Sequence, residues 1–150
     1  MTNKLLSDIY QPIFFRLNKP EDKNKFELLI QSETPVYIYD EIEGQLRELI
    51  KSLNPAIKID QEEYPALIEK HLKGQPIKDY GVWVFYPWNR NLVHLLDEEE
   101  FIEVRTNRNR YKITLEEQHE LRTKKIGVIG LSVGQSVSLT LAIERCFGSR

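Results

Sequence analysis

Three small residues near the end of the sequence have the types and the spacing of a phosphate-binding turn. Gly130, Ser132 and Gly134 follow an apolar run at 126–129 and precede a mostly apolar stretch at 137–146. This order predicts a buried strand, a tight turn and a helix. Small turn residues let the backbone approach a phosphate, and the amino end of the following helix attracts its charge. We therefore interpret the turn first as a nucleotide loop.

The same turn has a second chemical interpretation, as the nucleophile of a serine hydrolase. Residues 130–134 read G-L-S-V-G, which matches the G-x-S-x-G elbow with Ser132 as the nucleophile. That elbow needs an acid and then a histidine downstream, but Glu144 is the sole acid after Ser132, and no histidine follows. The three histidines lie upstream, at His71, His94 and His119. The catalytic triad of a hydrolase is therefore incomplete within these residues. The hydrolase interpretation stays open, as does a third one in which the turn has only a structural role.

Composition describes an ordinary globular protein. The chain has 150 residues, 41% hydrophobic residues and a formal net charge of −2, so its charge gives no general attraction to nucleic acid or anionic membranes. The single cysteine, Cys146, excludes an internal disulfide and a multi-cysteine metal site, and we expect it to be buried. No run resembles a signal peptide or approaches ~20 apolar residues, so we expect a cytoplasmic protein that binds neither nucleic acid nor membrane.

Periodicity predicts an α/β chain with two parts. Residues 1–104 read as a small α/β or α+β domain, and residues 105–150 read as the first strand-turn-helix unit of a Rossmann-like nucleotide-binding domain. Strands are expected at 12–17, 36–39, 56–59, 81–86, 91–96 and 125–130. Helices are expected after Pro20, at 40–53 with Asp40 as cap, at 65–72, at 97–102, from the capping box at 114–117, and at 137–146.

The hairpin strands carry aromatic residues whose role depends on the face they occupy. Alternation places Trp83 and Phe85 on one face, and Val82, Val84 and Tyr86 on the other. Trp83, Tyr86 and Trp88 would suit base stacking only beside a basic groove, and the sequence has none there. Core packing is therefore the favoured interpretation.

Residues 105–130 resemble the opening of a known enzyme family. Arg110-Tyr111, then Glu116-Glu117-Gln118 and Leu121, then the run at 125–130 into a small-residue turn, are similar to ThiF/MoeB adenylyltransferases, relatives of the ubiquitin-activating enzymes. The likeness extends over about 105–147. It implies that the turn at Gly130, Ser132 and Gly134 lies against ATP, and that Arg110 reaches the ATP phosphates, often across a dimer.

The reaction that this resemblance implies is adenylylation of a carboxylate, with ATP, Mg²⁺ and release of pyrophosphate. The usual acceptor is the C-terminus of a small ubiquitin-like or sulfur-carrier protein. Ser132 and Val133 stand where the family has glycine, and the family's later acid, arginine, lysine and cysteines would fall beyond Arg150. We therefore expect an N-terminal fragment, inactive alone, of a longer bacterial ThiF-type protein, while a short complete protein stays possible.

The first 104 residues leave a second class of function open. They are not part of the minimal family domain, and they could form a non-enzymatic interaction or dimerisation module. Its docking surface would use the hairpin aromatics, including Trp88. The sequence therefore gives three hypotheses, which are the adenylyltransferase, the interaction module and the serine hydrolase with Ser132 as nucleophile.

Overall fold

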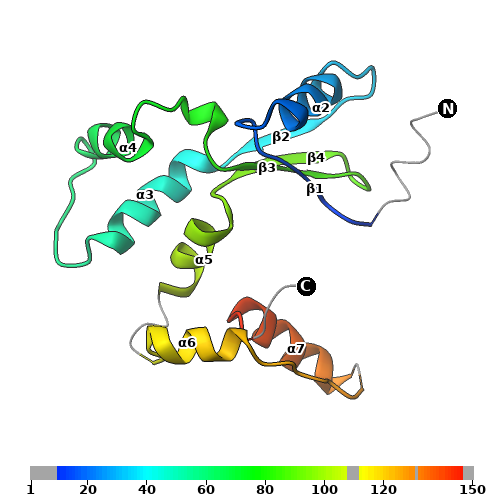
Figure 1. The fold of residues 1–150 in the computed structure, drawn as a ribbon, viewed down its shortest axis with the longest axis vertical. Helices are drawn as coiled ribbons and strands as arrows, with labels where there is room; N and C mark the ends of the chain where they lie inside the picture. Colours follow the sequence, from blue (N-terminus) through cyan, green and yellow to red (C-terminus); the bar gives the residue numbers. More distant parts are fainter. Residues whose placement is uncertain (1–9, 108–111, 131, 147–150) are drawn as a thin grey trace. The chain divides into compact units, whose positions relative to one another are not determined.

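The structure, a computed structural model, describes residues 10–107, 112–130 and 132–146. Its described part has six α-helices, one short 3-10 helix and a four-stranded mixed sheet (Figure 1), which confirms the α/β fold class. The elements are β1 Ile13–Phe15, α2 Pro20–Ile30, β2 Tyr37–Asp40, α3 Ile42–Leu53, α4 Tyr64–Leu72, η1 Ile77–Asp79, β3 Val82–Tyr86, β4 Asn91–Leu95, α5 Glu98–Thr106, α6 Leu115–Arg122 and α7 Val133–Ile143. The chain forms two compact units, Met1–Val104 and Arg105–Arg150.

The sheet of the first unit has the strand order β1-β3-β4-β2. β3 and β4 form the expected antiparallel hairpin, with Val84 opposite Val93, and β1 pairs antiparallel with β3. β2 pairs parallel with β4, so Ile38 lies beside Leu92, and β1 and β2 are the two edge strands. A parallel pair requires a long connection, and here α3, α4 and β3 all lie between the two paired strands in the sequence.

One core lies between the sheet and α2, which runs along one side of the sheet in Figure 1. The buried members of this core are Phe15, Leu17, Phe26, Trp83, Phe85 and Leu92. Trp83 and Phe85 therefore share a face, as alternation predicted, and the indole N–H of Trp83 donates to the carbonyl oxygen of Lys78 at 3.0 Å. The core-packing interpretation is confirmed for Trp83, whose side chain is buried. It is wrong for Trp88, which is 41% exposed in the hairpin loop, where no element that the structure describes covers that side of the ring.

A second core joins α3 and α4 beyond the end of the sheet. The predicted apolar stripe of α3 supplies Ile42, Leu46, Leu49 and Ile50 to this core, together with Tyr64, Ile68 and Leu96. The helix begins one residue later than a cap at Asp40 would require, with Glu41 at the N-cap. Asp40 still accepts a hydrogen bond from the backbone N–H of Ile42 at 3.3 Å. The same carboxylate oxygen also lies 2.9 Å from Nδ1 of His94.

Two predicted strands are wrong, and both lack a pairing partner. Residues 56–59 form a turn and irregular backbone, with Ile57 exposed, because β2 pairs with β4 instead. Residues 124–130 form no strand, and within the described part of the second unit no segment pairs with them. Ile129 is fully exposed rather than buried. An apolar run becomes a strand only where neighbouring backbone completes its hydrogen bonds, so the strand of the expected Rossmann-like unit is not formed here.

The final helix begins earlier than predicted. α7 starts at Val133, inside the expected turn, and ends at Ile143. Neither α7 nor any other helix that the structure describes is both long and apolar enough to cross a membrane.

Candidate functional site

The glycine turn that the sequence singles out has two backbone features of a phosphate loop. Gly130 has a φ of +85°, in the left-handed region that favours glycine. Two residues later Ser132 occupies the N-cap of α7 but makes no side-chain capping bond. The first backbone N–H groups of α7 therefore have no side-chain cap, and they are available to a ligand or to water.

Gly134 lies close to the segment that precedes the turn. A Cβ atom built on Gly134 would lie 2.8 Å from Cγ1 of Val128, closer than real Cβ contacts allow. The first turn of α7 thus approaches the preceding segment where a side chain would prevent contact. In dinucleotide-binding turns one glycine allows the tight turn and another allows this close packing. Gly130 and Gly134 supply both geometries, although no strand precedes them.

The other residues that the sequence singled out lie in different parts of the chain and do not form one site among the described residues. Arg110 lies outside the described residues. Ser132 is exposed, and among the described residues no hydrogen bond joins it to a histidine. His119 is exposed on α6, while His71 and His94 belong to the first unit. Cys146 is buried as expected.

Helix α6 is held by the predicted capping box. The Thr114 hydroxyl accepts from the backbone N–H of Glu117 at 3.2 Å, and the Glu117 carboxylate accepts from the N–H of Thr114 at 2.8 Å. The side chain of Gln118 donates to the carbonyl oxygens of Glu144 and Arg145 at the end of α7. These bonds fix α6 against α7 within the second unit.

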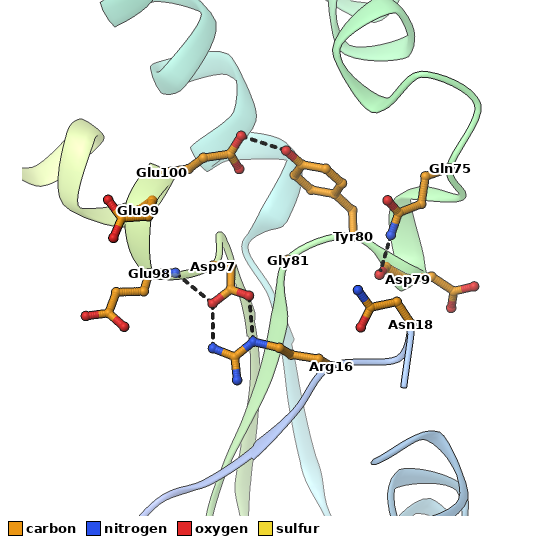
Figure 2. Close-up of a pocket in the computed structure, with 10 residues that line it drawn as sticks. All are labelled: Arg16, Asn18, Gln75, Asp79, Tyr80, Gly81, Asp97, Glu98, Glu99 and Glu100. Atoms are coloured by element: carbon orange, nitrogen blue, oxygen red, sulfur yellow. Dashed lines mark hydrogen bonds and ion pairs between the residues drawn. The ribbon is translucent and has the colours of Figure 1, made fainter. Parts of the chain in front are cut away.

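A polar cleft that sequence reasoning missed lies in the first unit (Figure 2). It has a volume of about 470 Å³, between the end of β1, the segment before β3 and the start of α5. Its lining residues are Arg16, Asn18, Gln75, Asp79, Tyr80, Gly81, Asp97, Glu98, Glu99 and Glu100. The lining therefore holds five carboxylates and a single guanidinium group, which bonds to Asp97 (Figure 2).

Arg16 and Asp97 form the strongest polar contact of this cleft. The guanidinium donates from Nε and Nη2 to the two carboxylate oxygens at 2.6 and 2.7 Å (Figure 2). Hydrogen bonds from Arg16 lower the pKa of Asp97, and the same contact raises the pKa of Arg16. Asp97 also accepts from the backbone N–H of Glu98 at 2.7 Å, which caps α5. The pair therefore ties the chain after β1 to the start of α5.

Tyr80, Glu100 and His71 form a second contact group along the same wall. The Tyr80 hydroxyl donates to Glu100 Oε1 at 2.7 Å, and Nε2 of His71 lies 2.9 Å from both oxygens. Burial, and then the bond to Glu100, raise the pKa of Tyr80, so its phenol stays protonated. Because that hydroxyl proton points to Glu100, Nε2 of His71 is the donor toward the carboxylate. His71 thus has the partners of a structural histidine.

His94 is fully buried behind this wall. Its Nδ1 lies 2.9 Å from an Asp40 carboxylate oxygen, and its Nε2 lies 2.7 Å from the Tyr80 carbonyl oxygen. Both partner atoms are oxygens, one from β2 and one from the backbone that precedes β3. The imidazole also stacks on Trp83, with ring centroids 4.1 Å apart and planes 9° from parallel. The ring therefore connects β2, β4 and the backbone that enters β3.

These contacts join the ionisable groups of the cleft into a structural network. Its best-placed ionisable groups bond one another, and it contains no serine, threonine or cysteine to act as a nucleophile. Within the described residues, no group of three histidine, cysteine or acidic side chains could hold a metal ion. Sequence reasoning missed the network because its members are far apart in the chain, as with the 81 residues that separate Arg16 from Asp97.

Comparison with known proteins gives one partial likeness. A stretch of 67 residues, 45% of this chain, is 45% identical to an uncharacterized protein of Mycobacterium tuberculosis (strain CDC 1551 / Oshkosh). That stretch is 9% of the relative's length, so the relative is a far longer polypeptide. No protein-family model matches the chain. No solved structure matches it either.

Proposed function

We propose that this chain is the N-terminal part of a ThiF-type, ATP-dependent adenylyltransferase. The single observation that carries this proposal is the backbone at the start of α7. A left-handed Gly130, an N-terminus without a side-chain cap and a Gly134 that allows no Cβ all occur within five residues. This combination is the one that lets backbone N–H groups approach a phosphate.

The proposed reaction activates a carboxylate. A carboxylate oxygen of the acceptor forms a bond to the α-phosphorus of ATP, and the bond from that phosphorus to the pyrophosphate oxygen breaks. The acceptor becomes an acyl adenylate, and the electron pair leaves with pyrophosphate. We assign the turn at Gly130, Ser132 and Gly134 to binding ATP. We assign Arg110 to neutralising phosphate charge, because a guanidinium fork matches phosphate oxygens.

The described residues suit the phosphates of ATP but not its Mg²⁺ ion. The turn suits a phosphate, as its backbone geometry requires no side chain. The described residues contain no group of three histidine, cysteine or acidic side chains that could hold the metal ion. We propose that further polypeptide supplies this group, together with the pocket for a ubiquitin-like or sulfur-carrier acceptor. A consumer of ATP with such a partner belongs in the cytoplasm.

Pyrophosphate exchange into ATP tests this assignment. The polypeptide of the complete open reading frame should exchange labelled pyrophosphate when its acceptor is present. Arg110→Ala, Ser132→Phe and Gly134→Val should each reduce exchange at least tenfold, because they remove phosphate contacts or obstruct the turn. Thr140→Ala, an exposed change two turns along α7, should leave exchange unchanged. Wild-type exchange in all three turn and arginine variants would remove the site assignment.

A second candidate is an interaction module formed by residues 1–104. The observation that favours it is Trp88, which remains exposed at the hairpin loop while Trp83 is buried. This module would form a stable oligomer that ignores nucleotides, and Trp88→Ala would weaken it. The serine hydrolase is a third candidate, for which a fluorophosphonate probe should label Ser132. Absence of labelling would contradict the hydrolase hypothesis.

A further inference from the structure

The sheet of the first unit has a face that α2 does not cover. In the pairing register, Phe14, Val84, Val93 and Tyr39 form one row across all four strands. Tyr86, Asn91 and Tyr37 form the next row across β3, β4 and β2. Because side chains alternate along a strand, both rows lie on the face opposite Trp83, Phe85 and Leu92, which pack under α2.

Aromatic side chains dominate the exposed part of these rows. Phe14 is 51% exposed, Tyr37 60% and Tyr39 48%, on the two edge strands. At the hairpin end, Trp88 is 41% exposed and contacts Tyr86 edge-to-face at 5.3 Å between ring centroids. Tyr10, which is 81% exposed, stacks on Trp88 at 6.4 Å. We call Tyr10, Phe14, Tyr37, Tyr39, Tyr86 and Trp88 the aromatic face.

The chemistry of the aromatic face selects an apolar partner. Neither row contains a charged residue, and the acid on β2, Asp40, alternates to the other side and contacts His94. β2 also lacks the lysine, proline or bulge that commonly protects an edge strand from association. Exposed aromatic residues without charge are typical of the buried centre of a protein interface. A nucleic acid or an acidic peptide would find no cation in these rows.

The available area matches a dimer between copies of this chain. An aromatic side chain contributes about 150–250 Å², and five of these residues are roughly half exposed or more, so their rings offer roughly 500 Å². A standard interface buries about 800 Å² on each partner. The rings thus supply more than half of one side, and the partly exposed Tyr86, Asn91 and Val93 add to this area, whereas Val84 is buried.

We propose that the aromatic face is the interface of a two-fold homodimer, in which a second copy of this chain packs the same face against it. A two-fold contact places one patch against its own copy, so an uncharged patch meets no like charge there. The aromatic face belongs to the first unit, so this inference rests on the interaction module of residues 1–104 and gives its interface, and it does not depend on the nucleotide site proposed in the second unit.

Sedimentation velocity of the 150-residue chain, at about 1 to 50 µM, tests the interface. Tyr37→Lys and Phe14→Lys, on opposite edges of the sheet, each place an ammonium group in the apolar contact on both copies. Each should raise the dimer dissociation constant at least ~100-fold. The matched controls are Leu28→Lys, on the outer side of α2, and Leu139→Lys, on α7, both of which replace exposed leucines. These controls should stay dimeric.

Far-UV circular dichroism and tryptophan fluorescence verify that each variant is folded. If either lysine variant unfolds, Trp88→Lys in the hairpin loop replaces it, with the same expected dissociation. A wild-type chain that is monomeric throughout this range overturns the inference. A dimer that survives substitution of the aromatic face in a folded protein also overturns it. Dissociation by Leu139→Lys alone would place the interface on the second unit and reject the aromatic face.

Discussion

Gly81 permits the sharpest test of the fold, because the structure gives it two separate reasons to be glycine. Its φ is +67°, in the left-handed region. A Cβ atom at this position would overlap the carbonyl oxygen of Leu95 and lie 3.1 Å from Cδ1 of Ile42. The first obstacle is backbone, held by the adjacent pairing of Val82 with Leu95, so it has little room to move.

The expected cost of Gly81→Ala is therefore the sum of two penalties. A left-handed conformation costs a residue with a Cβ about 1–2 kcal/mol. Overpacking against a fixed neighbour adds about 1–3 kcal/mol. We expect Gly81→Ala to lower the free energy of unfolding by about 2–5 kcal/mol, which is a large part of the stability of a small domain.

Two other glycines in the same unit separate these penalties. Gly74 has a φ of +85° but open space around a built Cβ, so Gly74→Ala should cost only about 1–2 kcal/mol. Gly44 lies within α3, also with open space, so Gly44→Ala should stabilise the protein by about 0.5–1 kcal/mol. Urea unfolding followed by circular dichroism measures all three. A Gly81→Ala variant no less stable than Gly74→Ala would refute the close approach to Leu95.

Three further predictions test the polar contacts. Asp97→Asn keeps the cap of α5 but loses the charge that faces Arg16, and at pH 7 it should lower the free energy of unfolding by about 1 kcal/mol, after allowance for partial exposure. The control Glu43→Gln, in the exposed pair with Arg47, should lower it by less than about 0.5 kcal/mol. Because folding lowers the pKa of Asp97, this contribution to stability is present above the ordinary pKa of about 4 and is lost as the pH falls through the lower pKa of the folded protein. In urea unfolding, the difference in stability between wild type and Asp97→Asn should therefore be smaller at pH 3 than at pH 7. An equal difference at the two pH values would contradict the ion pair. His94→Ala should cost about 3 kcal/mol in urea, since it removes two buried hydrogen bonds and the stacking on Trp83, and a cost below 1 kcal/mol would contradict its role. Thr114→Ala should cost about 1 kcal/mol and speed hydrogen exchange of the Glu117 amide, whereas unchanged exchange would count against the capping box.

Local signals predicted the helices and the hairpin well. The stripe of α3, Pro20 at the start of α2 and the capping box at Thr114 each act within a few residues, so the sequence alone exposes them. The hairpin follows for the same reason, since four residues separate its strands.

Pairing between distant segments could not be read in this way. The run at 124–130 and the residues at 56–59 have strand-like composition, but each lacks a partner, and composition carries no information on partners. The parallel pairing of β2 with β4 places Asp40 beside His94, 54 residues later. The Arg16–Asp97 and Tyr80–Glu100 contacts likewise depend on tertiary packing. The sequence drew attention to His71 only as one of three histidines, and its two partners were not foreseen.

The most direct test of the proposed function is pyrophosphate–ATP exchange by the polypeptide of the complete open reading frame. That polypeptide should be purified and assayed with Mg²⁺ and candidate ubiquitin-like or sulfur-carrier proteins. We predict label in ATP that depends on the carrier's C-terminal carboxylate and falls at least tenfold in Gly134→Val. Absence of exchange with every carrier, together with no ATP binding by the wild-type protein, would contradict the adenylyltransferase and leave the glycine turn as a packing element.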